Sequence, residues 1–442
     1  MPGLNIAVVG SGISGLSAAW LLSRRHQVTV YECDQRLGGH ANTVDVELSD
    51  GTVEVDTGFI VYNEKTYPNL TALFAHLGVK TQPSSMGFAL SVGSGTYEYS
   101  GTNANGYFGQ RRNIASPSHW ALLLEIRRFF DTAASRVETH AGEPTLGDFL
   151  RAEGYSSRFV EEHIVPMGAA IWSTTLREML NFPARTFLAF YGNHGLLQLS
   201  DRPAWRTVCG GSRNYVSALI SDADFRVIQG VGARRVARSA SKVVLEDTRG
   251  AMRPFDHVVF ATHADQALSL IEAPSDEETT LLGSFAYQPN EAVLHSDRRW
   301  MPQRRRVWSS WNFIKSERGL ESPLCLTYWM NELQGLETRV PLLVTLNPTA
   351  DIHPKAVHRT FSYRHPVFNA AALAAQKRLW NLQGRQRTWF CGSYFGYGFH
   401  EDGIQSGLAV AEQLGGVRRP WQVADESGRI NLAAGDAAEA AE

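Results

Sequence analysis

Glycine residues and one acidic residue near the start of the chain have the spacing of a dinucleotide-binding turn. An apolar run at residues 5–9 leads into this turn, a helical pattern follows at residues 16–23, and a second apolar run leads to Glu32. The turn reads Gly10-Ser11-Gly12-Ile13-Ser14-Gly15. The first glycine of such a motif allows a tight turn, the second lets a pyrophosphate approach the backbone, and the third lets the helix pack closely on the strand.

The helix and the acidic residue add two further contacts. The amino end of the helix offers N–H groups and its positive dipole end to phosphates. Glu32 stands where a carboxylate accepts hydrogen bonds from both hydroxyls of a ribose. The pattern therefore predicts a bound dinucleotide.

A second pair of glycines distinguishes between dinucleotides. Arg36, Gly38, Gly39 and His40 follow Glu32 closely. A glycine pair at this distance lets a second loop lie against the pyrophosphate, and nicotinamide dehydrogenases do not need such a loop. We expect this segment to bind the cofactor together with the first turn.

These motifs resemble the flavin-containing amine oxidase superfamily, in which an acidic residue is followed by R-x-G-G-R. The likeness continues through Val55–Gly58, residues 208–212, Val231, residues 258–262 and residues 392–407. Within the superfamily the chain is most similar to a bacterial branch of predicted FAD-dependent oxidoreductases, related to fatty-acid isomerases and desaturases. The resemblance implies non-covalently bound FAD. Beyond the first two loops, the cofactor-binding residues that it implies are Asp56, Thr57, Gly58, Val231, Gly392, Ser393, Gly403 and Ile404.

The resemblance also implies how the C-terminal motif acts. The helix that follows it would point its amino end at the flavin N1–C2=O edge, where the positive dipole end stabilises the negative charge of reduced flavin. Covalent members of the superfamily attach flavin through a cysteine in this motif. Here Cys391 precedes Gly392, too early to face the ring. We expect no covalent link.

Departures from the superfamily pattern bear on the reaction. Many amine oxidases place a lysine on a substrate-domain strand, but the similar segment here, residues 288–295, offers Asn290 or Glu291. His40 replaces a second arginine, and Ser393 replaces an acid that binds the ribityl chain. Fold and cofactor are compatible with these changes. Amine oxidation does not follow.

Aromatic residues surround the position next to the flavin. Phe399 corresponds to the ring beside the flavin in amine oxidases, and Tyr397 lies near it in the sequence. An aromatic wall can guide an amine lone pair or pack a hydrocarbon, and each ring could instead belong to the core. His400 could transfer a proton or position the cofactor. Weaker candidates for the same pocket are Tyr62, Asn63, Trp172 and His194.

Length and composition indicate an α/β protein with two interleaved domains. At 442 residues the chain is too long for one core. We expect a Rossmann-type FAD-binding domain, like that of glutathione reductase and amine oxidases, from residues 1–75, 200–280 and 385–417. Residues 76–199 and 281–384 would form an α+β substrate domain. Residues 418–442 are predicted to be a mobile tail.

Charge and cysteine content limit the classes of partner that the sequence predicts. The net charge of −2 gives no bulk attraction to nucleic acid, and the four cysteines, widely spaced, show no metal-ligand pattern. The segment 298–311, from Arg298 to Trp311, combines five arginines with three tryptophans. This composition suits an anionic membrane surface, although a solvated loop or a protein docking site would also explain it. We expect a cytoplasmic protein, peripheral on the inner membrane face if the segment is interfacial.

Two classes of function remain open. The first is a flavoenzyme that removes hydride from carbon, with a lipid or fatty acyl chain favoured over an amine, by desaturation or double-bond isomerisation. The second is a non-catalytic flavoprotein that serves as a redox sensor or as a subunit of an acyl-modifying complex. Rapid reduction of the flavin by substrate separates the two classes.

Overall fold

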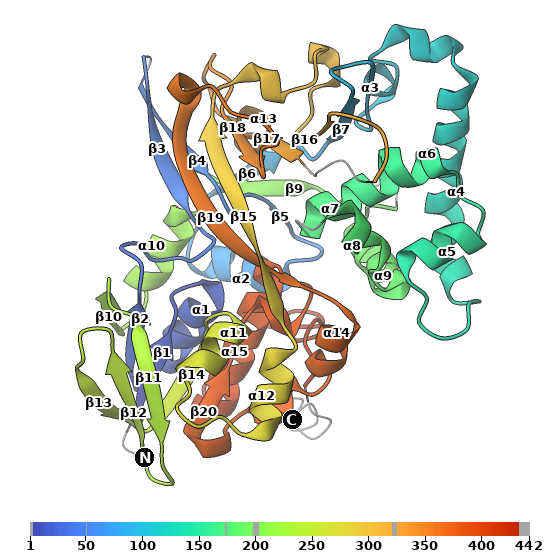
Figure 1. Ribbon diagram of the computed structural model, residues 1–442. Coiled ribbons are helices and arrows are strands. Elements are labelled where there is room, and N and C mark those ends of the chain that lie inside the picture. Colours follow the sequence, from blue (N-terminus) through green and yellow to red (C-terminus); the bar gives the residue numbers. More distant parts are fainter. Residues whose placement is uncertain (1–2, 50, 173–174, 198–202, 321–324, 433–442) are drawn as a thin grey trace.

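The protein is described here from a computed structural model, shown in Figure 1. The structure describes residues 3–49, 51–172, 175–197, 203–320 and 325–432. Two layered parts lie one above the other in Figure 1, joined by long strands, with a group of helices at the upper right.

A parallel sheet forms the centre of the lower part. Its strand order is β10-β2-β1-β14-β20, and every neighbouring pair runs parallel. These strands are β1 (Asn5–Val9), β2 (Gln27–Glu32), β10 (Arg226–Gln229), β14 (His257–Phe260) and β20 (Thr388–Phe390). Ile6, Ala7 and Val8 are fully buried, as expected for a parallel strand covered on both faces. The first βα turn and the C-terminal motif meet at this sheet.

Two helices that are far apart in sequence pack against each other beside the sheet. They are α1 (Ile13–Leu22) and α15 (His400–Gly415). A side chain on Gly407 would place its Cβ 2.3 Å from the Ser14 carbonyl oxygen, so this crossing requires glycine. The close approach brings the amino ends of both helices to one region. Helix α1 starts earlier than the pattern at residues 16–23 predicted.

Smaller elements surround the parallel sheet. An antiparallel sheet of β11 (Ala233–Arg238), β12 (Val243–Asp247) and β13 (Met252–Phe255) lies at one side. Helices α11 (Ala264–Leu270), α12 (Asp276–Gly283) and α14 (Ala370–Gln376) lie in the same lower part of Figure 1. Helices α2 (Pro68–His76) and α10 (Arg213–Ser221) pack against α15 and α1 respectively.

A mixed sheet forms the upper part, in the order β19-β15-β18-β17-β16-β7-β8. Its strands are β7 (Phe88–Val92), β8 (Tyr97–Ser100), β15 (Ala286–His295), β16 (Trp311–Lys315), β17 (Cys325–Trp329), β18 (Leu343–Leu346) and β19 (Val357–Val367). The long pair β15 and β19 reaches down to the lower part in Figure 1. Beside this sheet lie the hairpin β3 (Thr43–Leu48) and β4 (Gly51–Asp56), the small sheet of β5 (Tyr62–Asn63), β6 (Thr81–Ser84) and β9 (Trp205–Val208), and helix α13 (Met330–Gln334).

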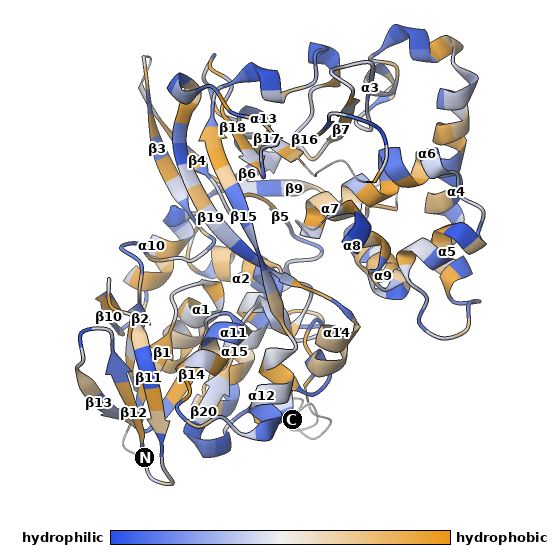
Figure 2. Ribbon diagram, in the orientation of Figure 1, coloured by the Kyte–Doolittle hydropathy of each residue, from blue (hydrophilic) through white to orange (hydrophobic). Residues whose placement is uncertain are grey.

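Helices α3 to α9 cover one side of the mixed sheet. They are α3 (Ala104–Tyr107), α4 (Pro117–Val137), α5 (Leu146–Ala152), α6 (Ser157–Phe159), α7 (Val165–Trp172), α8 (Leu176–Leu180) and α9 (Ala184–Asn193). Helix α4 is amphipathic: Leu122, Ile126 and Phe129 are buried, whereas Leu124 and Arg127 are exposed. Figure 2 shows apolar residues alternating with polar ones along these helices. Within the described ranges, none of the helices combines the length and apolar character that crossing a membrane requires.

The segment after α15 differs from the expected mobile tail. Arg419 is buried and its guanidinium contacts Glu412 at 2.8 Å. Arg429 lies near Asp402 and over the ring of Tyr67. These buried ion pairs hold residues 418–432 against α15 and α2, an interaction that the tail's composition did not reveal. Residues 433–442 lie outside the described residues.

The expected fold class is confirmed: the molecule is α/β, with a parallel Rossmann-type sheet and an additional α+β part.

Candidate functional site

One cavity joins the two parts of the molecule. It measures about 920 Å³ and runs from the first βα turn to the inner faces of α3, α4 and α7. We call the region around Gly12 and Glu32 the cofactor end and the region around Phe130 and Trp172 the substrate end. The volume is within the range of ligand pockets.

The three glycines of the first turn meet different surroundings. Gly10 has a φ of +104°, which other residues rarely adopt. A Cβ on Gly15 would lie 2.0 Å from the Gly10 carbonyl oxygen, so the turn and helix touch at this point. A Cβ on Gly12 would meet no atom of the described protein within 4 Å. The turn therefore leaves space over Gly12, at the amino end of α1, where a pyrophosphate fits.

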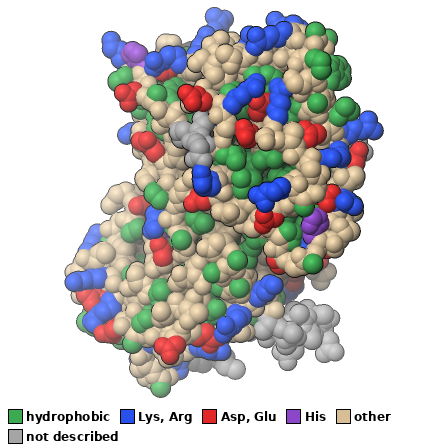
Figure 3. All heavy atoms as spheres, turned by 45° about the vertical axis from the view of Figure 1, so that its right-hand side comes forward, with side chains coloured by type: hydrophobic (Ala, Val, Ile, Leu, Met, Phe, Trp, Pro, Cys, Tyr) green, Lys and Arg blue, Asp and Glu red, His purple; other side chains and the backbone are tan. Residues whose placement is uncertain are grey.

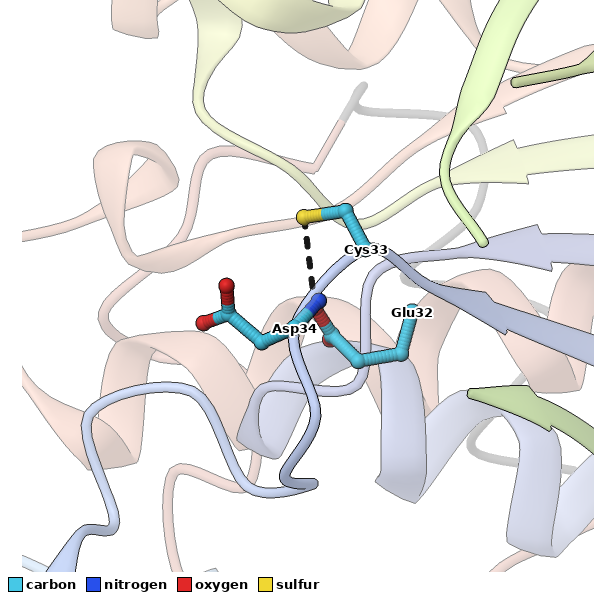
Figure 4. A group of neighbouring side chains, drawn as sticks. All are labelled: Glu32, Cys33 and Asp34. Atoms are coloured by element: carbon cyan, nitrogen blue, oxygen red, sulfur yellow. Dashed lines mark hydrogen bonds between the residues drawn. The ribbon is translucent and has the colours of Figure 1, made fainter. Parts of the chain in front are cut away.

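Glu32 ends β2 and lines the same end of the cavity (Figure 4). Its carboxylate accepts a hydrogen bond from the Ser11 N–H at 2.9 Å, another from the Ser11 hydroxyl, and a third from the Asp34 N–H at 2.9 Å. The fourth lone-pair direction receives only the weak Cys33 thiol donor at 3.4 Å. The geometry thus offers a ribose one acceptor position instead of the two that the sequence suggested.

Glu32, Cys33 and Asp34 are also the only close group of three potential metal ligands in the described part of the chain. The hydrogen bonds just described already engage Glu32. Partial burial and the neighbouring Glu32 carboxylate raise the pKa of the Cys33 thiol to about 11, so this thiol is protonated at neutral pH. We assign no metal to this group.

The second glycine loop lies against the first. Gly38 N–H donates to the Ser11 carbonyl at 3.0 Å, and a Cβ on Gly39 would approach Gly12 Cα to 2.9 Å. The Arg36 guanidinium donates to the Gly39 carbonyl at 2.6 Å and so braces the loop. Arg36, Gly39 and His40 line the cavity, whereas Gly38 is buried and does not line it.

The predicted cofactor-binding residues separate into two groups. Those that line the cavity are Gly10, Ser11, Gly12, Ser14, Glu32, Arg36, Gly39, His40, Thr57, Gly58, Gly392, Ser393 and Gly403. Those that do not are Gly15, Gly38, Asp56, Val231 and Ile404. The backbone N–H of Val231 bonds to the Glu32 carbonyl, and its neighbours Gly232 and Ala233 face the cavity.

Asp56 holds two loops together behind the cavity. Its carboxylate accepts hydrogen bonds from the hydroxyls of Thr43 and Ser212, from the Ser212 N–H and from the Gln334 amide. Burial raises the pKa of Asp56 to about 6, against these hydrogen bonds. Asp56, which the sequence predicted to bind the cofactor, does not line the cavity, whereas its neighbours Thr57 and Gly58 do.

Residues of the C-terminal motif also line the cavity. Gly392 N–H donates to the Ser406 hydroxyl at 3.0 Å, and Gly403, in the first turn of α15, lines the cavity. The amino end of this long helix therefore faces the cavity, where it favours negative charge. Cys391 is fully buried and does not line the cavity.

Phe399, His400 and Tyr397 all line the cavity. Phe399 stacks on Phe190 with ring centroids 5.1 Å apart. His400 stacks on Phe59 at 3.7 Å, and its Nε2 is hydrogen-bonded to the Tyr215 hydroxyl at 2.9 Å. Burial lowers the pKa of His400 to about 3, so this imidazole is neutral and a weak base. These contacts suit a positioning role for His400.

Three histidines gather beside the second glycine loop, and of these the sequence indicated only His40. His40 and His365 have ring centroids 5.4 Å apart, and His263 stacks on Tyr287 at 4.3 Å. Burial lowers the pKa of His263 and of His365 to about 4 and holds that of His40 well below its ordinary value. All three imidazoles are therefore neutral.

Asn290 explains the placement of His365. It is fully buried and bonds to His365 Nδ1 at 3.0 Å. The segment 288–295 had been expected to present Asn290 or Glu291 to the flavin. Neither lines the cavity; from β15, Asn290 supports His365 on the adjacent strand β19 instead. Pairing of β15 with β19 is a long-range contact, and no local pattern indicates it.

The substrate end is lined by aromatic and aliphatic side chains. Its rings come from Phe88, Tyr107, Phe130, Trp172, Phe190, Trp311, Tyr328, Phe361 and Phe399. None of the six lysines lines the cavity, and the acidic residues among the described lining residues, Glu32 and Asp34, are at the cofactor end. Of the weaker candidates, Trp172 and His194 line the cavity, whereas Tyr62 and Asn63 do not.

The segment 298–311 is less exposed than its composition suggested. Trp300 is buried, and the Trp308 ring is covered by the Arg305 guanidinium at 3.9 Å. Trp311 lines the cavity. Arg304 is paired at 2.8 Å with Glu98, which is fully buried. The three tryptophans thus make contacts within the fold, and the membrane contact expected of this segment stays a prediction.

Comparison with known proteins finds a family whose model matches most of the chain. A model of the family described as flavin containing amine oxidoreductase matches residues 13–415. A carotenoid phi-ring synthase from Streptomyces griseus is 44% identical over 70 residues, which are 15% of this chain and 13% of that protein. The match thus spans only a small part of that relative.

Solved structures agree on the fold. A fatty acid isomerase from P. acnes superposes with a TM-score of 0.65 at 14% identity, covering 94% of this chain and 98% of the isomerase. A putrescine oxidase with bound putrescine gives 0.62 at 15% identity, with 93% and 99% covered. Cyclohexylamine oxidase from Brevibacterium oxydans gives 0.61 at 16% identity, with 93% and 100% covered.

Proposed function

The chain belongs to the flavin-containing amine oxidoreductase family, and from this membership we propose that it uses FAD to remove hydride from an acyl chain of a membrane lipid. The outcome is a new double bond or a shifted one. The observation that carries the proposal is the substrate end of the cavity, which is aromatic and has no lysine or carboxylate among the described residues.

The lining argues against ammonium substrates. A cationic amine leaving water needs a carboxylate or a comparable partner, because burial of an unpaired charge is strongly unfavourable. The acidic lining residues lie at Glu32 and Asp34, by the first βα turn. A neutral hydrocarbon chain has no such requirement, and burial of its methylene groups is favourable by about 0.8 kcal/mol each.

The cofactor end fits FAD. The space over Gly12, the amino ends of α1 and α15, and the bracing of the second loop by Arg36 provide for a pyrophosphate and an anionic ring edge. When bound there, the flavin supplies a two-electron acceptor for hydride. Because Cys391 is buried away from the cavity, we propose a non-covalent cofactor, which acid precipitation of the protein should release.

The aromatic rings then have two tasks. Phe399, stacked on Phe190, excludes water and holds one carbon of the chain in place. The faces of these rings also stabilise positive charge that develops on the carbon losing hydride, as in cation–π contacts. An allylic or branched carbon is favoured, because its developing charge is delocalised. The neutral His365 and His400 do not oppose this charge.

One protein with the same fold supports the isomerisation outcome. Similar structures include a fatty acid isomerase, described as producing CLA, and amine oxidases. A hydride that returns to another carbon of the chain gives isomerisation. A hydride passed on to dioxygen or another acceptor, with loss of a proton from the adjacent carbon, gives desaturation.

Anaerobic stopped-flow spectroscopy tests the proposal. Detergent-dispersed phospholipids with unsaturated or methyl-branched chains should bleach the flavin band, or be recovered with a changed mass (desaturation) or a shifted double bond at unchanged mass (isomerisation, measured by gas chromatography of the fatty-acid esters). Benzylamine and putrescine should bleach it little. Fast reduction by either amine would restore amine oxidation, and inertness toward all these compounds would favour a non-catalytic flavoprotein.

A further inference from the structure

Large apolar side chains are exposed on one face of the helical part. Ile114, Trp120 and Leu124 are exposed by 53%, 47% and 66%. Trp120 and Leu124 are one helical turn apart on α4, and the Trp120 indole N–H donates to the Ile114 carbonyl at 2.9 Å. These three residues therefore form one patch, which we call the α4 patch.

Arginines flank the α4 patch at both ends. Arg111 and Arg112 precede it, Arg127 and Arg128 follow it, and all four are exposed. Figure 3 brings this side of the molecule forward and shows hydrophobic side chains among basic ones. The acidic residues between 111 and 131 are Glu125, which accepts from the Ser156 N–H at 2.8 Å, and Asp131, 3.5 Å from Arg127. The face therefore carries a net positive charge.

The α4 patch lies on the outside of the substrate end. Tyr107 of α3 and Phe130 of α4 line the cavity from within, and α4 carries Trp120 and Leu124 on its outer face. Arg306 packs its side chain 3.4 Å from the position of a Cβ on Gly109, two residues before Arg111 in the chain. The basic part of the segment 298–311 thus reaches this face, although its tryptophans do not.

We propose that the α4 patch docks the protein on an anionic lipid surface. Trp120, Leu124 and Ile114 would enter the headgroup region, where indoles and aliphatic side chains are favourable, and the arginines would meet lipid phosphates. Charge complementarity selects anionic lipid as the occupant, because four exposed arginines would repel one another in a second copy of the same face. The purpose of docking, the supply of acyl chains, rests on the proposed function. Docking itself can be measured without turnover.

Sedimentation with vesicles tests the docking. The holoprotein is mixed with vesicles of phosphatidylglycerol or of phosphatidylcholine, at low and high salt, and the bound fraction is measured. We expect binding to phosphatidylglycerol that weakens with salt. Leu124→Glu should reduce it about tenfold or more, and Arg127→Gln with Arg128→Gln about fivefold for each charge removed.

Matched controls come from the opposite part of the molecule. Met252 is 59% exposed on β13, and Arg249 is exposed beside it. Met252→Glu and Arg249→Gln change the same properties away from α4 and should leave vesicle binding unchanged. Flavin content and the thermal midpoint report that each variant is folded.

Three outcomes would overturn the proposal. The first is a wild-type protein that does not bind phosphatidylglycerol vesicles, and the second is equal loss of binding in the control variants. The third is a dimer in size-exclusion chromatography that Leu124→Glu converts to a monomer, because the face would then be a contact between copies. If vesicles bind as expected but lipids never reduce the flavin, docking stands and the proposed function fails.

Discussion

The two ends of the cavity are lined by different kinds of chemical group. At the cofactor end the contacts come from backbone and glycine: Gly10 and Gly12 in one loop and Gly39 in the next. At the substrate end they come from side-chain rings on elements far apart in sequence, such as Phe88 and Phe361. Backbone contacts with a phosphate require particular residues at fixed spacing, whereas a ring-lined space can be filled in many ways. The cofactor end therefore carries the motifs by which the sequence resembles the family.

The largest expected effect is loss of flavin binding through a substitution at the cofactor end alone. Gly12→Val should abolish flavin binding, because the added side chain fills the space over the turn. It should leave the apoprotein folded, since no atom of the described protein lies within 4 Å of a Cβ there. Flavin absorbance per polypeptide and the far-ultraviolet circular dichroism of the apoprotein give the two measurements.

Substitutions of two other glycines serve as controls for this result. Gly15→Val should prevent folding, because even a Cβ would overlap the Gly10 carbonyl. Gly192→Val, on the exposed surface of α9 with nothing within 4 Å, should retain both fold and flavin. Flavin retained at normal stoichiometry in Gly12→Val would show that the cofactor does not lie on this turn.

The sequence predicted the cofactor end better than the substrate end. Strand β1, the first turn and the N-terminal motif of α15 are local patterns with direct physical reasons, and the structure brings them together around one cavity. Asp56 lies in a similar motif, but its carboxylate is directed toward Ser212, more than a hundred residues away. No local pattern could separate its role from that of the neighbouring Thr57.

The substrate end was the less predictable. His365 lies in the cavity because β19 pairs with β15, and Asn290 holds it there. Trp300 and Trp308 looked like surface residues by composition, but ion pairing of Arg304 with Glu98 and stacking of Arg305 draw their segment against the mixed sheet. Such contacts depend on the whole fold, so composition alone could not indicate them.

A smaller effect is expected at the substrate end. Phe399→Ala should keep flavin and fold but slow flavin reduction by an acyl substrate about a hundredfold, because the carbon is no longer held in place. Phe399→Tyr retains the ring and should keep most of the rate. Anaerobic stopped-flow traces at saturating substrate give the rates. Unchanged reduction in Phe399→Ala would mean that this ring belongs to the core and does not position substrate.

The smallest effect concerns His400, which lines the cavity. Burial lowers its pKa to about 3 from an ordinary value of 6.5, so the folded protein excludes a proton that the unfolded chain accepts. The stability from the neutral imidazole is therefore complete above pH 6.5 and is lost progressively as the pH falls from there toward 3. His400→Asn removes this dependence.

Urea unfolding of parent and variant at several pH values measures the difference. The advantage of the parent over His400→Asn should shrink by about 1.4 kcal/mol for each pH unit below the ordinary histidine pKa. Asp56, whose pKa burial raises to about 6, acts in the opposite sense in both proteins, so it cancels from the comparison. His76→Gln, at an exposed position on α2, is the control and should follow the parent. A constant difference across this range would show that His400 is protonated in the folded protein, and its assignment as a neutral positioning residue would then be wrong.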